Sequence, residues 1–165
     1  MNDLERAVEL RQLGKLQESR ELLLDLLTQE PNNPSVWYQC AWVHDVMELE
    51  REAIPYYLKS LELGLQGEER QGAFLGLGST YRTIGMYEQS KAILEEAINE
   101  YPEKKEYQVF LAMVKYNLKE YSDAMEIVLR LLGETSSDQG IQSYKSAILY
   151  YSNKLDTIWG KDDTR

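Results

Sequence analysis

Residues 73–90, AFLGLGSTYRTIGMYEQS, contain the pattern that decides the fold. Within this stretch a small residue, Gly78, precedes a second small residue, Ser90. Equivalent pairs recur along the chain, and they are Ala7 with Ser19, Ala41 with Ala53, and Ala112 with Ala124. The first members of the four pairs form one set and the second members form another. In both sets, successive residues are 34, 37 and 34 positions apart. Two sets with the same spacing indicate four copies of one structural unit.

Each unit is predicted to be a pair of helices joined by a turn. A small residue lets two helix backbones approach closely, while larger side chains fill the space around the crossing. Gly14 and Gly85 lie between the two small residues, where a helix end favours a residue that tolerates positive φ. Glu48 and Lys119 hold the same place in the other two units, where the turn is less strongly marked.

The four hairpins are expected at about residues 1–33, 34–70, 71–104 and 105–137. We expect the three extra residues of the 37-residue interval in a longer turn at residues 67–70. Residues 141–151 again have helical periodicity, so a capping helix is predicted over about 138–155 to cover the last apolar face. Residues 1–155 would then form a single domain, followed by a flexible tail at residues 156–165.

The pattern resembles the tetratricopeptide repeat, a helix-turn-helix unit with small, aromatic and proline residues at set positions. The third unit matches best, through Phe74, Leu77, Gly78, Tyr81, Gly85, Tyr87, Ser90, Leu94, Ala97 and Pro102. The second unit departs from it, with His44 where Tyr is usual. The resemblance covers residues 2–136 and implies an all-α, right-handed solenoid. In its general run the chain is similar to small stand-alone bacterial repeat proteins, which implies a protein-binding or scaffold role.

Composition limits the partners and the compartment. The 165 residues have a formal net charge of −10, which repels nucleic acids and anionic membrane surfaces. A single cysteine, Cys40, permits no intrachain disulfide, in keeping with a reducing cytoplasm. No signal peptide or bilayer-length apolar stretch is apparent, so we expect a cytoplasmic protein without a membrane partner.

The resemblance also places the first helix of each hairpin on a concave face. Residues three before, one after and four after the first small residue share one side of that helix. Eight of these twelve residues are apolar or aromatic, whereas a solvated face would carry charges, so we predict a partner-binding surface. Arg11 and Arg82 are candidates to meet a peptide carboxylate, and burial of part of this face as core is the alternative. The twelve residues are Leu4, Val8, Arg11, Tyr38, Trp42, Asp45, Leu75, Ser79, Arg82, Val109, Met113 and Tyr116.

The chain contains few residues suited to catalysis or metal binding. His44 is the only histidine, and one His with one Cys cannot form a triad or a histidine-based metal site. We expect His44 and Cys40 to be packed core residues. Residues 76–80, GLGST, lack the lysine of a phosphate loop, and Tyr81 stands where a dinucleotide motif needs its third glycine. No enzymatic activity, cofactor or metal is therefore predicted.

Three functional hypotheses follow. The first is a non-catalytic module that holds a peptide, helix or loop of another protein on its concave face. The second is a structural homo-oligomer, such as a homodimer, in which the apolar face or the capping helix mediates self-association. The third is a regulatory or scaffold subunit of a larger complex. The sequence does not specify the identity of the partner.

Overall fold

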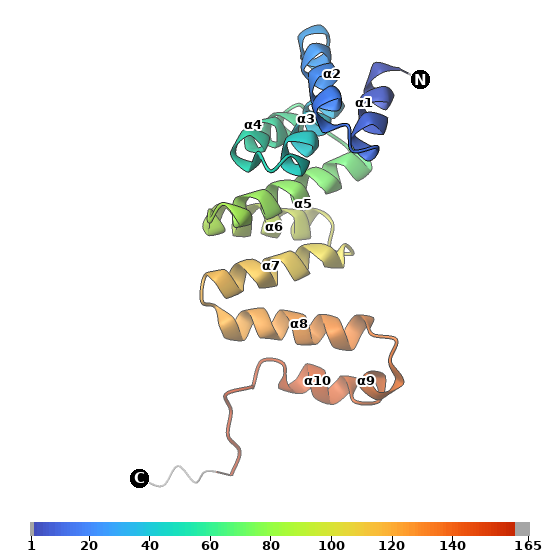
Figure 1. Ribbon diagram of the computed structural model, residues 1–165. Coiled ribbons are helices and arrows are strands. Elements are labelled where there is room, and N and C mark those ends of the chain that lie inside the picture. The colour runs from blue at the N-terminus through green and yellow to red at the C-terminus, as the bar shows by residue number, and fades with distance from the viewer. Residues whose placement is uncertain (1, 161–165) are drawn as a thin grey trace. The chain divides into compact units, whose positions relative to one another are not determined.

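The computed structural model describes residues 2–160, and every regular element in that range is an α-helix (Figure 1). The predicted all-α class, built of helix-turn-helix hairpins, is confirmed: α1–α2, α3–α4, α5–α6 and α7–α8 are the four hairpins. In chain order the helices are α1 (Asp3–Gln12), α2 (Leu16–Gln29), α3 (Pro34–Val46), α4 (Glu50–Glu62), α5 (Gly67–Thr83), α6 (Tyr87–Glu100), α7 (Lys105–Asn117), α8 (Tyr121–Thr135), α9 (Gln139–Ser143) and α10 (Lys145–Tyr151).

The chain divides into two compact units, which are described separately below. Unit 1 comprises residues 1–110 and contains α1 to α6 with the beginning of α7. Unit 2 comprises residues 111–165 and contains the rest of α7 and helices α8 to α10. The single domain expected over residues 1–155 stays a prediction. Of the predicted tail, residues 156–160 contain no helix, and residues 161–165 lie outside the described part of the chain.

The small residues of the repeat meet where the two helices of a hairpin cross. In the first hairpin the Ser19 hydroxyl donates a 2.7 Å hydrogen bond to the carbonyl oxygen of Ala7. In the third, the Ser90 hydroxyl donates a 2.6 Å bond to the carbonyl oxygen of Gly78. A Cβ atom on Gly78 would lie 2.8 Å from the side chain of Leu94. A larger residue at position 78 would therefore push the two helices apart.

The turns inside the hairpins share one backbone conformation. Gly14 and Gly85 have φ values of 76° and 80°, as their positions in the repeat predict. Glu48 and Lys119 adopt the same left-handed conformation, with φ values of 60° and 66°, although they carry side chains. The turn is therefore imposed by the packing of the two helices on each other, even where the local residue disfavours it.

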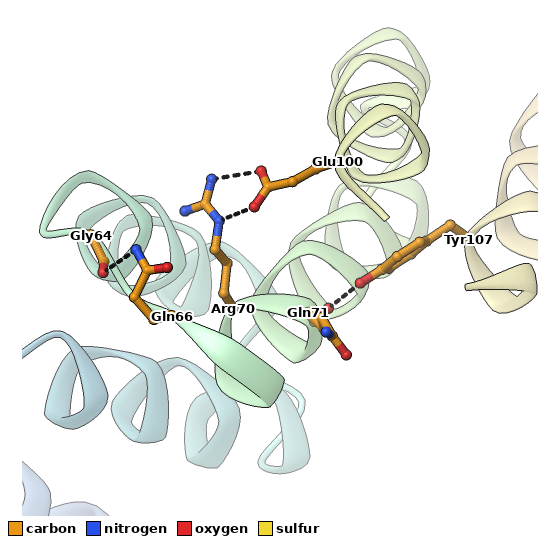
Figure 2. A network of polar contacts seen from close by, with 6 residues as sticks. All are labelled: Gly64, Gln66, Arg70, Gln71, Glu100 and Tyr107. Carbon is orange, nitrogen blue, oxygen red and sulfur yellow. Dashed lines mark hydrogen bonds and ion pairs between the residues drawn. The ribbon is translucent and has the colours of Figure 1, made fainter. Parts of the chain in front are cut away.

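Residues 67–70 are helical, so the longer turn predicted there is wrong. Helix α5 begins at Gly67, and the third hairpin starts four residues before the predicted boundary at residue 71. Glu68 and Glu69 lie in the first turn of α5, where acidic side chains favour the positive end of the helix dipole. Arg70 is fixed by the carboxylate of Glu100 at the end of α6 (Figure 2). The extra residues thus lengthen a helix rather than a loop.

Unit 1 has two buried apolar clusters. One joins α1, α2 and α3, and it contains Ala7, Leu23, Leu26, Val36, Cys40 and Val43. The other joins α3, α4 and α5, and it contains Tyr38, Ala41, Ala53, Tyr57, Leu65, Ala73 and Leu77. Helix α3 contributes to both clusters because nearly its whole circumference is apolar or small.

The predicted capping helix is interrupted in unit 2. Instead of one helix over residues 138–155, the chain forms α9 and α10, which meet at Tyr144, and α10 ends at Tyr151. The side-chain amide of Gln142 donates hydrogen bonds of 3.1 and 2.6 Å to the carbonyl oxygens of Gly133 and Ser136. These bonds tie α9 to the end of α8, and the chain then turns before α10 packs on α8.

Candidate functional site

A groove of about 450 Å³ lies in unit 1 among α3, α4, α5 and the start of α7. Five of the twelve predicted residues line it, namely Tyr38, Trp42, Asp45, Leu75 and Ser79. The prediction missed five others that also line it, namely Val46, Tyr57, Gly72, Gly76 and Phe110. The second hairpin and helix α5 of the third therefore supply most of the groove, and Phe110 on α7 supplies the rest.

Two tyrosines form the buried floor of the groove. Tyr38, on α3, and Tyr57, on α4, are both almost inaccessible, and their ring centroids are 6.3 Å apart. Burial raises the pKa of Tyr38 to about 12 and raises that of Tyr57 further. Tyr38 was predicted to be an exposed anchor, but it belongs to the core because its ring packs between α4 and α5.

Glycines on α5 make room for both rings. A Cβ atom on Gly72 would clash with the hydroxyl of Tyr38, and one on Gly76 would lie 2.6 Å from Cζ of Tyr57. The two glycines are four residues apart and therefore lie on one face of the helix. Their spacing, together with a tyrosine in each of the two preceding helices, is the signal that the sequence prediction overlooked.

Among the described residues 2–160, Asp45 is the only charged residue that lines the groove. Its Oδ2 accepts a 2.7 Å hydrogen bond from the Tyr57 hydroxyl, and the Thr80 hydroxyl lies 2.8 Å from its Oδ1. Burial raises the pKa of the Asp45 carboxyl group, while these two hydrogen bonds oppose the rise. The carboxylate is held in place at the edge of an otherwise apolar surface.

Trp42 presents an exposed ring whose other face is fixed. Its side chain is 41% exposed, and the guanidinium carbon of Arg11 lies 3.7 Å from its ring centroid. Such a cation–π contact favours one orientation of the indole. The rings of Trp42 and Tyr38 also pack together, with centroids 5.7 Å apart. An aromatic side chain held in this way is preorganised, so it can bind a partner with little loss of side-chain entropy.

Arg11 is engaged within the protein, contrary to the prediction that it meets a peptide carboxylate. It is buried, and its Nη1 donates a 2.7 Å hydrogen bond to Oε1 of Gln39. The Gln39 amide donates in turn a 2.9 Å bond to Oε1 of Glu69. Burial lowers the pKa of Arg11, opposed by the nearby Tyr38, Tyr57 and Glu69. This chain of hydrogen bonds links α1, α3 and α5.

The remaining predicted residues lie elsewhere. Leu4 packs against the buried cluster of α1 to α3, and Val8 is half-buried on α1. Val109 is exposed, and Arg82 is half-buried near the end of α5; neither lines the groove. Met113 and Tyr116 are exposed residues of unit 2.

The two residues considered for catalysis are packed as expected. Nδ1 of His44 lies 2.7 Å from the carbonyl oxygen of Cys40, and its Nε2 accepts a 3.1 Å hydrogen bond from Nε of Arg20. The ring stacks on Tyr56 at 4.7 Å. Burial raises the pKa of the Cys40 thiol to about 12, which suppresses the reactive thiolate.

Residues 2–160 also bear on metal binding and on membrane spanning. Within that range no three His, Cys, Asp or Glu side chains are placed to hold a metal ion together. The helices of the same range include none with both the length and the apolar character needed to cross a bilayer.

Comparison with known proteins was made at three levels. A search of curated proteins yields no match. Among solved structures, YrrB, a TPR protein with an unusual peptide-binding site, superposes with a TM-score of 0.71 at 17% identity, over 92% of this chain and 77% of that one. MamA from Desulfovibrio magneticus RS-1 gives 0.69 at 14% identity, over 94% and 96%. A putative kinesin light chain from Podosopora anserina, with nearly identical TPR-like repeats, gives 0.66 at 17%, over 93% and 85%.

At these identities the solved structures establish similarity of fold alone. The family comparison goes further, because the model of the Tetratrico peptide repeat matches residues 34–155, which is more than half of the chain. That match includes α3 to α5, whose side chains form most of the groove. With its four helix-turn-helix hairpins and this family match, the chain belongs to the tetratricopeptide repeat family.

Proposed function

We propose that this chain is a non-catalytic module that binds a segment of another protein in the groove of unit 1. The observation that carries the proposal is Trp42, a large aromatic ring that is exposed on one face and held by Arg11 on the other. Exposed aromatic residues with fixed orientation are the common anchors of protein interfaces. Tetratricopeptide repeat proteins generally mediate protein–protein interactions, and YrrB, of similar fold, has a peptide-binding site.

The chemistry of the groove favours a particular kind of segment. Its walls are mainly apolar, and Asp45 supplies the only carboxylate among the residues that line it. Residues 1–110 contain 11 Lys and Arg residues against 20 Asp and Glu residues, so unit 1 repels acidic segments. We therefore propose a segment with an aromatic or branched apolar side chain next to a Lys or Arg residue. The apolar group would contact Trp42 and Leu75, and the basic group would approach Asp45.

Selection from a random peptide library on the immobilised full chain would test this proposal. We expect the enriched peptides to combine an apolar anchor with a neighbouring basic residue. Trp42→Ala should weaken their binding by about tenfold to a hundredfold, as for other aromatic anchors. Asp45→Asn should retain the apolar preference and lose the basic one.

Trp37→Ala is the matched control. Trp37 lies on the same helix, but its indole nitrogen donates a hydrogen bond to the carbonyl oxygen of Pro31, and it does not line the groove. Equal binding by the wild-type chain and by a folded Trp42→Ala variant would refute the groove assignment. Enrichment of acidic peptides would refute the proposed chemistry.

A further inference from the structure

Four apolar side chains form an exposed stripe along α8 in unit 2. They are Tyr121, Met125, Val128 and Leu132, with exposed fractions of 54%, 47%, 45% and 42%. Their spacing of four, three and four residues places them on one face of the helix. Twelve of the 17 large exposed apolar residues in the described chain lie in unit 2. An apolar patch of this kind marks a contact surface.

The internal repeat shows that the equivalent face is covered in the earlier hairpins. The residue four positions after the second small residue is Leu23, Tyr57 or Leu94 in the first three hairpins, and each of these is at most 2% exposed. Val128 occupies that position in the fourth hairpin. In the first two hairpins the cover is the first helix of the following hairpin. Arg20 on α2 reaches His44 on α3, and Tyr57 on α4 packs against Gly76 on α5.

The closing segment of the chain does not provide this cover. Helix α10 contacts α8 around Gly133, where a Cβ atom would lie 3.6 Å from Leu149 and 3.7 Å from Ile148. The interruption at Tyr144 limits α10 to seven residues. Within residues 111–160 nothing buries the stripe to the extent seen in the first three hairpins. The repeat therefore provides a helix-binding surface that lacks its helix.

We propose that a second copy of this chain covers the surface, with α8 pairing antiparallel with α8 of that copy. A two-fold axis between Met125 and Val128 would place each of them opposite the other of the second copy, and Tyr121 opposite Leu132. The four-three-four spacing is that of helices packed at about 20°. The stripe is thus complementary to itself, as a two-fold interface requires.

The distribution of charge supports this choice of partner. Residues 111–165 contain seven Lys and Arg residues against eight Asp and Glu residues, so this part of the chain is close to neutral. Residues 1–110 carry nearly all of the net negative charge. Two copies that meet through α8 therefore approach with their least repulsive regions. This pairing is independent of the groove in unit 1.

Sedimentation velocity of the full chain over a micromolar concentration series would test the pairing. We expect a concentration-dependent species of twice the 19.2 kDa chain mass. Met125→Glu combined with Val128→Glu should weaken association by about a hundredfold or more, because charges would be buried in an apolar interface. Met125→Lys combined with Val128→Lys should do the same. Mixing these two variants should restore a dimer, because opposite charges would then face each other.

Leu58→Glu is the matched control, since Leu58 on α4 is also 45% exposed but lies outside the stripe. This variant should dimerise like the wild type, and circular dichroism should show that all variants are folded. If a charged pair fails to fold, Met125→Ala combined with Val128→Ala should still weaken the dimer by about tenfold or more. A monomeric wild type, a dimer that tolerates the α8 variants, or a mixture that stays monomeric would overturn the proposal. None of these variants should change peptide binding in the groove.

Discussion

Gly76 lies against the ring of Tyr57, whose hydroxyl donates a 2.7 Å hydrogen bond to Asp45 at the edge of the groove. Glycine in the middle of a helix is costly, because it loses more backbone entropy than alanine. Glycine is nevertheless required at position 76, because the Tyr57 ring occupies the space that a Cβ atom would need and is itself too buried to move. The absence of a Cβ atom at position 76 thus leaves room for the Tyr57 ring, and the Tyr57 hydroxyl positions the carboxylate of Asp45.

Gly76→Ala should lower the free energy of unfolding by about 1–2 kcal/mol. Crowding of a packed core costs about 1–3 kcal/mol, which outweighs the gain of up to about 1 kcal/mol in helix propensity. Gly133→Ala on α8 is the control, because its Cβ atom would meet Leu149 at an ordinary distance of 3.6 Å. That variant should be more stable than the wild type by about 0.5–1 kcal/mol. Urea unfolding would measure both, and stabilisation by Gly76→Ala would contradict the packing argument.

Glu48 and Lys119 show strain of the opposite kind, since side-chain-bearing residues occupy turns that suit glycine. Glu48→Gly should raise the free energy of unfolding by about 0.5–1 kcal/mol. The left-handed conformation costs a residue with a side chain about 1–2 kcal/mol, and glycine avoids this cost. Part of the gain is offset because glycine has more backbone entropy in the unfolded chain. Gly14→Ala should destabilise by a similar amount. Thermal denaturation would compare the two, and opposite signs are expected.

At the scale of the helices, the first turn of α5 is held by side chains of α6 and α7. Arg70 in its first turn makes a two-point ion pair with Glu100 at the end of α6, with N–O distances of 2.6 and 2.9 Å. The carbonyl oxygen of the next residue, Gln71, accepts a 2.9 Å hydrogen bond from the hydroxyl of Tyr107 on α7 (Figure 2). These contacts explain why residues 67–70 join the helix instead of forming a turn.

The contribution of the Arg70–Glu100 pair should be modest and dependent on pH. The hydrogen bond from Arg70 lowers the pKa of the Glu100 carboxyl group below 4.5. Its stabilisation is therefore present above the ordinary pKa of glutamate and is lost as the pH falls through the lowered value. Because Glu100 is 36% exposed, a double-mutant cycle with Arg70→Ala and Glu100→Ala should give a coupling of about 0.5–1 kcal/mol at neutral pH. A coupling that persists in acid would contradict this assignment.

At the scale of the whole molecule, burial raises the pKa of several side chains. Burial raises the pKa of Tyr38 and of Tyr107 from 10.0 to about 12, and that of Cys40 from 9.0 to about 12. In each case the folded chain retains a proton that the unfolded chain releases. Their combined contribution is complete below about pH 9 and declines from there to pH 12.

The free energy of unfolding should therefore fall steeply between pH 9 and 12. Each of these groups lowers the free energy of unfolding by up to about 1.4 kcal/mol for each pH unit of rise, as long as it is protonated in the folded chain and deprotonated in the unfolded one. Urea unfolding at a series of pH values would measure the slope, and tyrosinate absorbance would follow ionisation. Cys40→Ala should reduce the slope between pH 9 and 10 even if it lowers stability at neutral pH. An unchanged slope in that variant would show that Cys40 does not contribute.

The hairpins could be predicted from the sequence, because their signals are local and repeated. Small residues at a fixed interval can be recognised without knowing what they contact, and Ala7, Ser19, Gly78 and Ser90 do meet at the helix crossings. The turns at Gly14 and Gly85 follow from backbone preferences of single residues.

Which residues are exposed could not be predicted from the sequence, because burial depends on contacts with residues that are distant in the chain. Arg11 is buried because its guanidinium group donates a hydrogen bond to Gln39 and packs on the ring of Trp42. Leu23 and Val128 occupy the same position in the repeat, yet one is buried and the other is exposed. No periodicity distinguishes them, since the difference lies in whether a following helix covers the site.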